Sequence, residues 1–204
     1  MFTKLKGGIY LDKIIVSGQC SKIGKTKFIE ETINNLCGKI FALKAAVSDD
    51  KKDITISIEE DLKNNEEKDT GRYLKAGADK AAYLKSNLND LAEGIDKIEK
   101  DNDEDYDYKI YEGNNVIDFV KPTFVIFLKD NNLEKKYSAD KASRKADIII
   151  DYSNDKRDII FNTESIICYK AHLLADIMGV SVGRIGKLLN EADIKIKGCQ
   201  LGLF

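Results

Sequence analysis

Histidine and proline are scarce in this sequence of 204 residues, each occurring once. His172 is the single histidine, and the cysteines Cys20, Cys37, Cys168 and Cys199 are far apart and form no Cys-x-x-Cys pair. A zinc cage draws on clustered cysteine and histidine ligands, so this composition argues against a zinc site. We expect reduced thiols, as is usual in the cytoplasm.

Long apolar runs are also missing. No segment approaches the roughly 20 apolar residues that span a bilayer, and the first eight residues lack the apolar core of a secretion signal. The formal net charge of −2 gives no general attraction to nucleic acid or to anionic membranes. With 43% hydrophobic and 33% charged residues, we expect a cytoplasmic protein with a sizeable core and no membrane partner.

An apolar segment followed by Gly-Lys-Thr is the most informative pattern in the chain. Residues 14–18 predict a buried strand, residues 19–23 a loop, and Gly24-Lys25-Thr26 the start of a helix. A strand before this motif and a helix after it are the context of a Walker A phosphate-binding P-loop, and they disfavour a chance Gly-Lys-Thr in a lysine-rich chain.

The P-loop interpretation assigns chemistry to each part of this segment. Backbone N–H groups at the start of a helix, together with the helix dipole, hold nucleotide phosphates. Lys25 is expected to reach the β- and γ-phosphates, and the Thr26 hydroxyl to bind Mg²⁺. The candidate cofactor-binding residues are Gln19, Cys20, Ser21, Lys22, Ile23, Gly24, Lys25, Thr26 and Lys27.

The match to the motif departs at one position. Gln19 stands where the first glycine is usual, and Gly18 lies one residue too early. Either Gln19 turns the chain, or the loop is slightly longer than usual. Lys22 adds a second positive charge that is expected to flank a phosphate, and Cys20 is a candidate for a reactive thiol at a helix N-terminus.

Strand and helix patterns alternate along residues 1–162. Strands are expected at 39–47, 54–58, 80–85, 108–112, 123–128, 146–151 and 157–161, and helices after residue 24 and at 71–78 and 88–98. This alternation predicts a P-loop NTPase-type α/β domain, with a mostly parallel sheet and helices on both faces. Pro122 is expected to begin the 123–128 strand, a position that a sheet tolerates.

Glu112 is the second chemical feature. It ends an apolar segment, precedes Gly113-Asn114, and is expected at the carboxyl edge of the sheet, where open α/β folds bind ligands. A carboxylate there can hold Mg²⁺ or polarise a water against the γ-phosphate. Glu112 is therefore the candidate catalytic residue, and Thr26 and Glu112 are the candidate metal ligands.

With these features, the chain resembles the molybdopterin-guanine dinucleotide biosynthesis protein B family. The resemblance spans about residues 13–130 and is carried by Ser21-Lys-Ile-Gly-Lys-Thr26, Ala42-Leu-Lys44, Lys68-Asp-Thr-Gly-Arg-Tyr-Leu-Lys-Ala-Gly-Ala78 and Glu112-Gly113. It implies a GTP-associated nucleotide-binding protein. Such proteins assist a partner nucleotidyltransferase that attaches GMP to the molybdenum cofactor.

The resemblance also assigns residues. It implies that Gly24, Lys25 and Thr26 bind phosphate and Mg²⁺, that Glu112 is the acidic residue of the Glu-Gly motif, and that Lys44 and Asp69 lie near the nucleotide. The family's histidine-rich stretch after the second strand is here Ala-Ala-Val-Ser-Asp-Asp.

Nucleotide choice and turnover are less defined by the sequence. GTP rather than ATP follows from kinship alone, because no Asn-Lys-x-Asp occurs; Lys129-Asp130 and residues 151–154 are the candidates for base contact. Hydrolysis is expected to be slow, since Arg72 is the sole candidate for an arginine finger. A partner or a homodimer could supply the missing charge.

Residues 163–204 predict a separate helix-turn-helix-like module. A helix ending at Gly179 and a second one capped by Ser181 share an apolar face. Arg184 and Lys187 lie on the second helix, but the segment carries five basic against four acidic side chains. A DNA reader usually presents a clearly basic face. We therefore expect a docking or dimerising module, with DNA binding as the alternative.

Two other functions remain open. A small-molecule kinase or ligase could use the same loop, and a nucleotide-sensing regulator could bind DNA through the tail.

Overall fold

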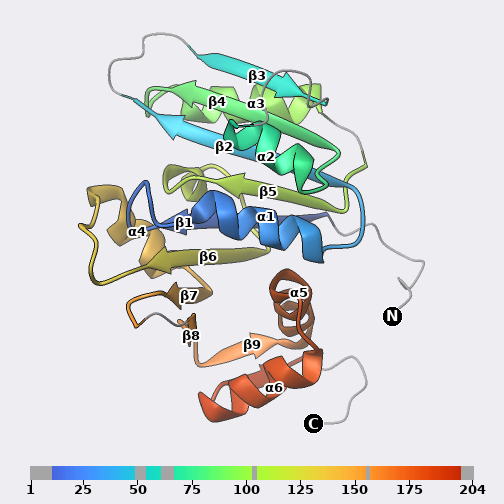
Figure 1. Ribbon diagram of the computed structural model, residues 1–204, viewed down its shortest axis with the longest axis vertical. Helices are drawn as coiled ribbons and strands as arrows, with labels where there is room; N and C mark the ends of the chain where they lie inside the picture. Colours follow the sequence, from blue (N-terminus) through green and yellow to red (C-terminus); the bar gives the residue numbers. More distant parts are fainter. Residues whose placement is uncertain (1–10, 49–53, 61–66, 103–104, 155–156, 199–204) are drawn as a thin grey trace.

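The computed structural model describes residues 11–48, 54–60, 67–102, 105–154 and 157–198. Within these ranges strands and helices alternate along the chain (Figure 1). The strands are β1 Asp12–Gly18, β2 Ile40–Val47, β3 Thr55–Glu59, β4 Lys80–Ser86, β5 Tyr108–Glu112, β6 Phe124–Lys129, β7 Ile148–Asp151, β8 Asp158–Phe161, β9 Ser165–Ile167 and β10 Lys195–Lys197. The helices are α1 Lys25–Asn35, α2 Asp69–Lys75, α3 Leu91–Asp101, the 3₁₀ helix η1 Asn115–Asp118, α4 Tyr137–Lys145, α5 Cys168–Met178 and α6 Val182–Glu191.

Eight of these strands form one sheet in the order β3-β4-β2-β5-β1-β6-β7-β8. The six strands from β4 to β7 pair in parallel, and β3 and β8 pair antiparallel at the two edges. The predicted mixed α/β fold with a mostly parallel sheet is confirmed. The parallel strands bring the carboxyl ends of β1, β5 and β2 to one edge, and this edge positions the candidate site.

Both faces of the sheet are covered. On β1, Ile14 and Val16 belong to a hydrophobic cluster that includes α1, whereas Ile15 between them belongs to a second cluster that includes α3 and α4. This alternation is the period of two along a strand. Figure 1 shows α1 and α2 in front of the sheet and α3 behind it. Burial on both faces explains why the central strands are continuously apolar.

Some element boundaries differ from the sequence-based expectation. The helix expected from residue 88 begins at Leu91, because Asn87 Oδ1 accepts a hydrogen bond from Asp90 N and holds a turn before the helix. The strand expected to begin at Pro122 begins at Phe124. The helix expected at 71–78 spans Asp69–Lys75. Among the described helices, none is both long and apolar enough to cross a membrane.

The C-terminal segment packs against the sheet. Leu174 on α5 and Ile185 and Leu189 on α6 are buried in the cluster that contains α1, and Asn35 Nδ2 at the end of α1 donates to the Ile177 carbonyl. The short parallel strands β9 and β10 join the start and the end of this segment, which the sequence did not predict. In contrast to the buried face of α6, Arg184 is exposed.

Candidate functional site

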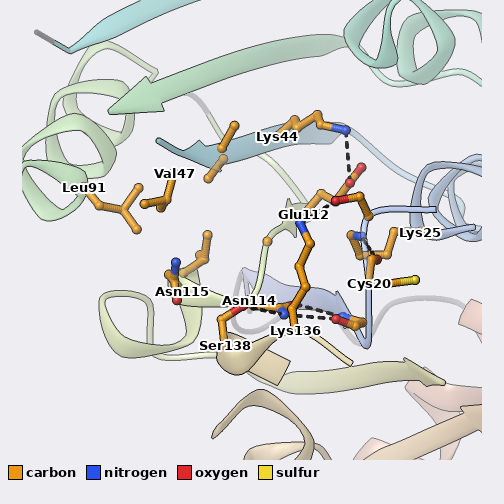
Figure 2. A pocket seen from close by; sticks show the side chains of 16 residues that line it. Cys20, Lys25, Lys44, Val47, Leu91, Glu112, Asn114, Asn115, Lys136 and Ser138 are labelled. Carbon is orange, nitrogen blue, oxygen red and sulfur yellow. Dashed lines mark hydrogen bonds and ion pairs between the residues drawn. The ribbon is translucent and has the colours of Figure 1, made fainter. Parts of the chain in front are cut away.

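A cleft of about 310 Å³ lies at the carboxyl ends of β1, β5 and β2 (Figure 2). One part of its wall comes from the turn between β1 and α1, through residues such as Gly18, Cys20, Ser21 and Lys25. The other walls come from the end of β2, Leu91 at the start of α3, the segment 112–116 at the end of β5, and the region of Lys136 and Ser138 at the start of α4. The sheet order therefore brings five sequence-distant segments around one cavity.

The turn depends on a close approach at Gly18. A Cβ at this position would lie 2.6 Å from Ile23 Cγ2 and 3.3 Å from carbons of Lys25, so the backbone can fold over Gly18 only without a side chain. Gly24, at the N-cap of α1, has a φ of 94°. Gly18 thus provides the close contact that the sequence motif assigned to position 19, and Gly24 provides the left-handed turn into the helix.

Gln19, the first residue after β1, is held by the segment that follows β6. Its N–H donates to the Leu128 carbonyl at 2.9 Å, and its side-chain Nε2 donates to the Asp130 carbonyl at 2.8 Å and to Leu133 O. Asp193 is the described non-glycine residue with a positive φ. Gln19 therefore does not adopt the left-handed backbone conformation that a glycine at its position would allow. The glutamine side chain is therefore turned toward segment 130–133 and does not line the cleft.

Lys25 is held inside the turn. Its Nζ donates to the Cys20 carbonyl at 3.0 Å, and none of the described carboxylates forms an ion pair with it. Burial lowers the pKa of Lys25; the Glu112 carboxylate opposes this shift, and the charges of Lys44 and Lys136 add to it. Lys25 is half-buried; a partly desolvated cation without a carboxylate partner is unfavourable, and a bound anion would offset that cost.

Thr26 faces two carboxylates that come from different elements. Its hydroxyl donates to Asp69 Oδ1 at 2.8 Å, and Glu112 Oε2 lies 3.1 Å away. Lys44 Nζ ion-pairs with Glu112 Oε1 at 3.1 Å and with Asp69 Oδ2. The Tyr73 hydroxyl donates to Glu112 Oε2. These five residues form one network, called here the carboxylate cluster.

The charge states of the carboxylate cluster follow from its contacts. Burial acts to lower the pKa of Lys44, but Glu112 and Asp69 raise it by more, so the amine stays charged. Burial raises the pKa of Asp69, but the hydrogen bonds and charge of Lys44 and the Thr26 hydroxyl lower it by more. Burial and the Glu112 charge raise the pKa of Tyr73 well above its ordinary value, so the phenol remains a donor.

The carboxylate cluster offers the donor set that Mg²⁺ requires. Thr26, Asp69 and Glu112 present a hydroxyl and two carboxylates, all hard oxygen ligands. The described residues contain no group of three or more histidine, cysteine or acidic side chains suited to a metal. Mg²⁺ usually binds through one or two carboxylates and takes its other ligands from water and phosphate, so these residues fit it.

The remaining residues of the predicted loop take different positions. Cys20 and Ser21 line the cleft, Lys22 is exposed, and Ile23 is buried in the core beside Gly18. Lys22 and Lys27 do not line the cleft; Lys27 lines a separate hollow on the outer face of α1. The side chains of Lys22, Ile23 and Lys27 are therefore not aimed at the cavity.

Arg72, considered as an arginine finger, points elsewhere. Its Nε and Nη2 donate to the two carboxylate oxygens of Glu30 at 2.8 and 2.7 Å, which joins α2 to α1. It does not line the cleft. In this arrangement Arg72 is a helix-to-helix contact, and the sequence could not reveal its pairing with a residue 42 positions away.

The candidate base-contact residues lie beyond β6 and β7. Lys129 Nζ ion-pairs with Asp151 Oδ2 at 2.9 Å, and Asp151 Oδ1 accepts from Ser153 N at 2.9 Å. Asp130 lies in the segment that holds the Gln19 side chain. These residues are therefore grouped on the side of the turn opposite to Lys44.

Two residues of the cleft were not predicted as site residues from the sequence. Asn114 holds Gly18 through its side-chain amide, and Lys136, at the N-cap of α4, contacts the Ser21 hydroxyl. Asn114 followed the Glu112-Gly113 pair and could have been included on that ground. Lys136 lies 115 residues after Ser21 in a polar segment without a motif, so only the fold brings it to the cleft.

Comparisons of the chain with models of protein families, with curated proteins and with solved structures found no match.

Proposed function

We propose that this protein binds a nucleoside triphosphate and Mg²⁺ in the cleft at the end of β1, with the turn at residues 18–26 acting as a P-loop. The observation that carries the proposal is the pair Lys25 and Thr26. Lys25 is a half-buried cation with no carboxylate ion pair among the described residues, and the next residue, Thr26, faces Asp69 and Glu112. The Lys25 end of this arrangement attracts an anion, and the end with Asp69 and Glu112 attracts a cation. Together the two ends suit the phosphates and the metal ion of a Mg²⁺-triphosphate.

Each group in the site has a separate task in this proposal. The backbone N–H groups of residues 20–26 and the N-terminus of α1 hold phosphate oxygens. Lys25 neutralises charge on the β- and γ-phosphates. Thr26, Asp69 and Glu112 would hold Mg²⁺, which when bound neutralises phosphate charge. Lys44 already pairs with both carboxylates, so it limits their mutual repulsion.

The family resemblance supplies the finer part of the proposal. On this basis the nucleotide is GTP, and the protein assists a partner nucleotidyltransferase in guanylylation of the molybdenum cofactor. Lys44 and Asp69, which the resemblance assigned near the nucleotide, ion-pair with each other, and both contact residues of the proposed Mg²⁺ site. That grouping supports the resemblance beyond the loop itself. Arg72 is engaged by Glu30, which supports slow hydrolysis unless a partner or second copy adds a cation.

A small-molecule kinase or ligase is the second candidate. The cleft continues past Glu112 to Ala45, Ala46 and Val47 at the end of β2 and to Asn115. Two strand spacings separate β1 from β2, or about 10 Å. This space lies beyond the phosphate end of the cleft and could admit a phosphoryl acceptor.

Identification of the bound nucleotide tests the proposal and separates its two versions. The purified protein is denatured, and the released small molecules are identified by mass spectrometry. The stripped protein is then titrated with GTP and ATP, with and without Mg²⁺. Preferential GTP binding supports the cofactor-maturation version, whereas ATP binding with transfer of labelled phosphate to a metabolite supports the kinase. Failure to bind either nucleotide contradicts both.

A further inference from the structure

Lys136 introduces a second positive charge into the cleft from a separate wall. It is the N-cap residue of α4, and its N–H donates to the Gln19 carbonyl at 3.0 Å. Its side-chain amine donates to the Ser21 hydroxyl. Figure 2 shows the side chain extending across the cavity toward the turn that carries Cys20 and Lys25. The backbone contact to Gln19 fixes the start of this side chain relative to the turn.

The charge of Lys136 is not neutralised by a neighbouring carboxylate. Among the described residues its amine contacts a hydroxyl and no acidic side chain. The adjacent Lys135 differs, because it ion-pairs with Asp140. Lys25 also lacks a carboxylate partner, and both amines line the same cavity. Two cations from different elements that converge on one cavity, neither of them ion-paired with a described carboxylate, form a binding site for an anion.

The position of Lys136 indicates which phosphate of a bound nucleotide its amine would contact. The turn and α1 contact phosphates from one side, and Lys136 approaches from the segment between β6 and α4, on another side of the cavity. Glu112 and Lys44 of the carboxylate cluster line the same cavity, and a Mg²⁺ held by Thr26, Asp69 and Glu112 would neutralise charge on the phosphates that Lys25 is expected to reach. Lys25 is expected to reach the β- and γ-phosphates, and Lys136 faces it across the same cavity, so the end of the phosphate chain is the part of the anion that both amines would contact.

We propose that Lys136 is a phosphate-contacting residue that binds the terminal phosphate of a nucleoside triphosphate and so distinguishes triphosphate from diphosphate. This inference rests on the proposed function of the cleft and extends it. A cation supplied by the same chain stabilises negative charge on the terminal phosphate without a partner protein. Lys136 thus takes the task for which Arg72 was considered.

The experiment compares Lys136→Met with Lys135→Met, which removes the same charge one residue away. Affinities for a non-hydrolysable GTP analogue, GDP and the corresponding adenine nucleotides are measured by calorimetry with saturating Mg²⁺. In Lys136→Met the affinity for the triphosphate analogue falls about tenfold, the value of one charge-assisted hydrogen bond. The diphosphate affinity changes less than about threefold, since its missing phosphate is the one that Lys136 contacts. Lys136→Arg retains most of the discrimination.

Each outcome has a distinct meaning. If the wild type binds the triphosphate and Lys136→Met binds it equally well, the assignment of Lys136 is wrong and the proposed function stands. If Lys135→Met weakens triphosphate binding as much as Lys136→Met, the effect is general electrostatics and the assignment is also overturned. Equal losses for triphosphate and diphosphate would overturn the contact with the terminal phosphate. If the wild type binds no nucleotide, the proposed function itself fails.

Discussion

The side-chain amide of Asn114 holds both polar groups of the Gly18 backbone. Its Oδ1 accepts from Gly18 N at 2.9 Å, and its Nδ2 donates to Gly18 O at 3.0 Å. Asn114 follows Glu112 by two residues, and Gly18 is the last residue of β1. The two hydrogen bonds therefore join the segment that carries the candidate catalytic carboxylate to the start of the candidate phosphate-binding turn.

Loss of this amide should destabilise the fold. Asn114→Ala leaves the Gly18 N–H and carbonyl without their partner, and we expect the free energy of unfolding in urea to fall by about 1–3 kcal/mol. Asn115→Ala is the matched control, because no hydrogen bond of the Asn115 side chain occurs among the described residues. Equal stability of the wild type and Asn114→Ala would show that the amide does not hold the turn.

A methyl group at Gly18 should also disturb the turn. Gly18→Ala places a Cβ 2.6 Å from Ile23 Cγ2, and such overpacking costs about 1–3 kcal/mol of stability. Gly183 in α6 is a useful contrast, because a Cβ there meets nothing within 4 Å. Gly183→Ala should stabilise the protein by about 0.5–1 kcal/mol. Thermal unfolding of both variants measures the difference, and a neutral Gly18→Ala would contradict the close approach.

The Asp69–Lys44 ion pair predicts a specific acid sensitivity. The pKa of Asp69 is lower in the folded protein than in the unfolded chain, so the unfolded chain binds more protons as the pH falls. The stabilisation is complete above the unfolded value of about 3.9 and is lost as the pH falls through the folded pKa. The free energy of unfolding between pH 6 and 3 should therefore decrease less steeply in Asp69→Asn than in the wild type.

Lys44→Met checks the cause of that slope. Without the Lys44 amine, the pKa of Asp69 loses its main lowering influence, and the acid dependence should flatten as it does in Asp69→Asn. A slope equal to that of the wild type would show that another group stabilises the Asp69 carboxylate.

The Thr26 hydroxyl predicts a metal effect that is separable from phosphate binding. In Thr26→Ala the increase in triphosphate affinity caused by Mg²⁺ should fall by about tenfold, whereas binding without metal is largely kept. Thr26→Ser retains the hydroxyl and should behave as the wild type. Electron paramagnetic resonance of Mn²⁺ with the nucleotide reads metal binding directly. An unchanged Mn²⁺ signal in Thr26→Ala would remove Thr26 from the metal site.

The sequence predicted the parts of the fold and site that depend on local patterns. Continuous apolar segments such as 14–16 indicated buried parallel strands, and the Gly24-Lys25-Thr26 sequence indicated the start of α1. Glu112 was expected at the same sheet edge as Lys25, because parallel strands end together. The cleft contains both residues.

Other features depend on long-range contacts that periodicity does not encode. The composition of the edge strand β3 does not reveal whether it pairs antiparallel or parallel with its neighbour. Ser21 and Lys136, or Arg72 and Glu30, meet only because the chain folds, and a single sequence contains no signal for those pairs. The strands β9 and β10 have three residues each, too few for a pattern.

The central claim is that Lys25 binds nucleotide phosphate, and calorimetric titration of Lys25→Ala with GTP and ATP in the presence of Mg²⁺ tests it most directly. Lys22→Ala, which removes an exposed charge from the same loop, is the control. We predict that Lys25→Ala loses more than about a hundredfold in affinity, the value of two charge-assisted hydrogen bonds, while Lys22→Ala stays close to the wild type. Nucleotide affinity that is unchanged in Lys25→Ala would contradict the account.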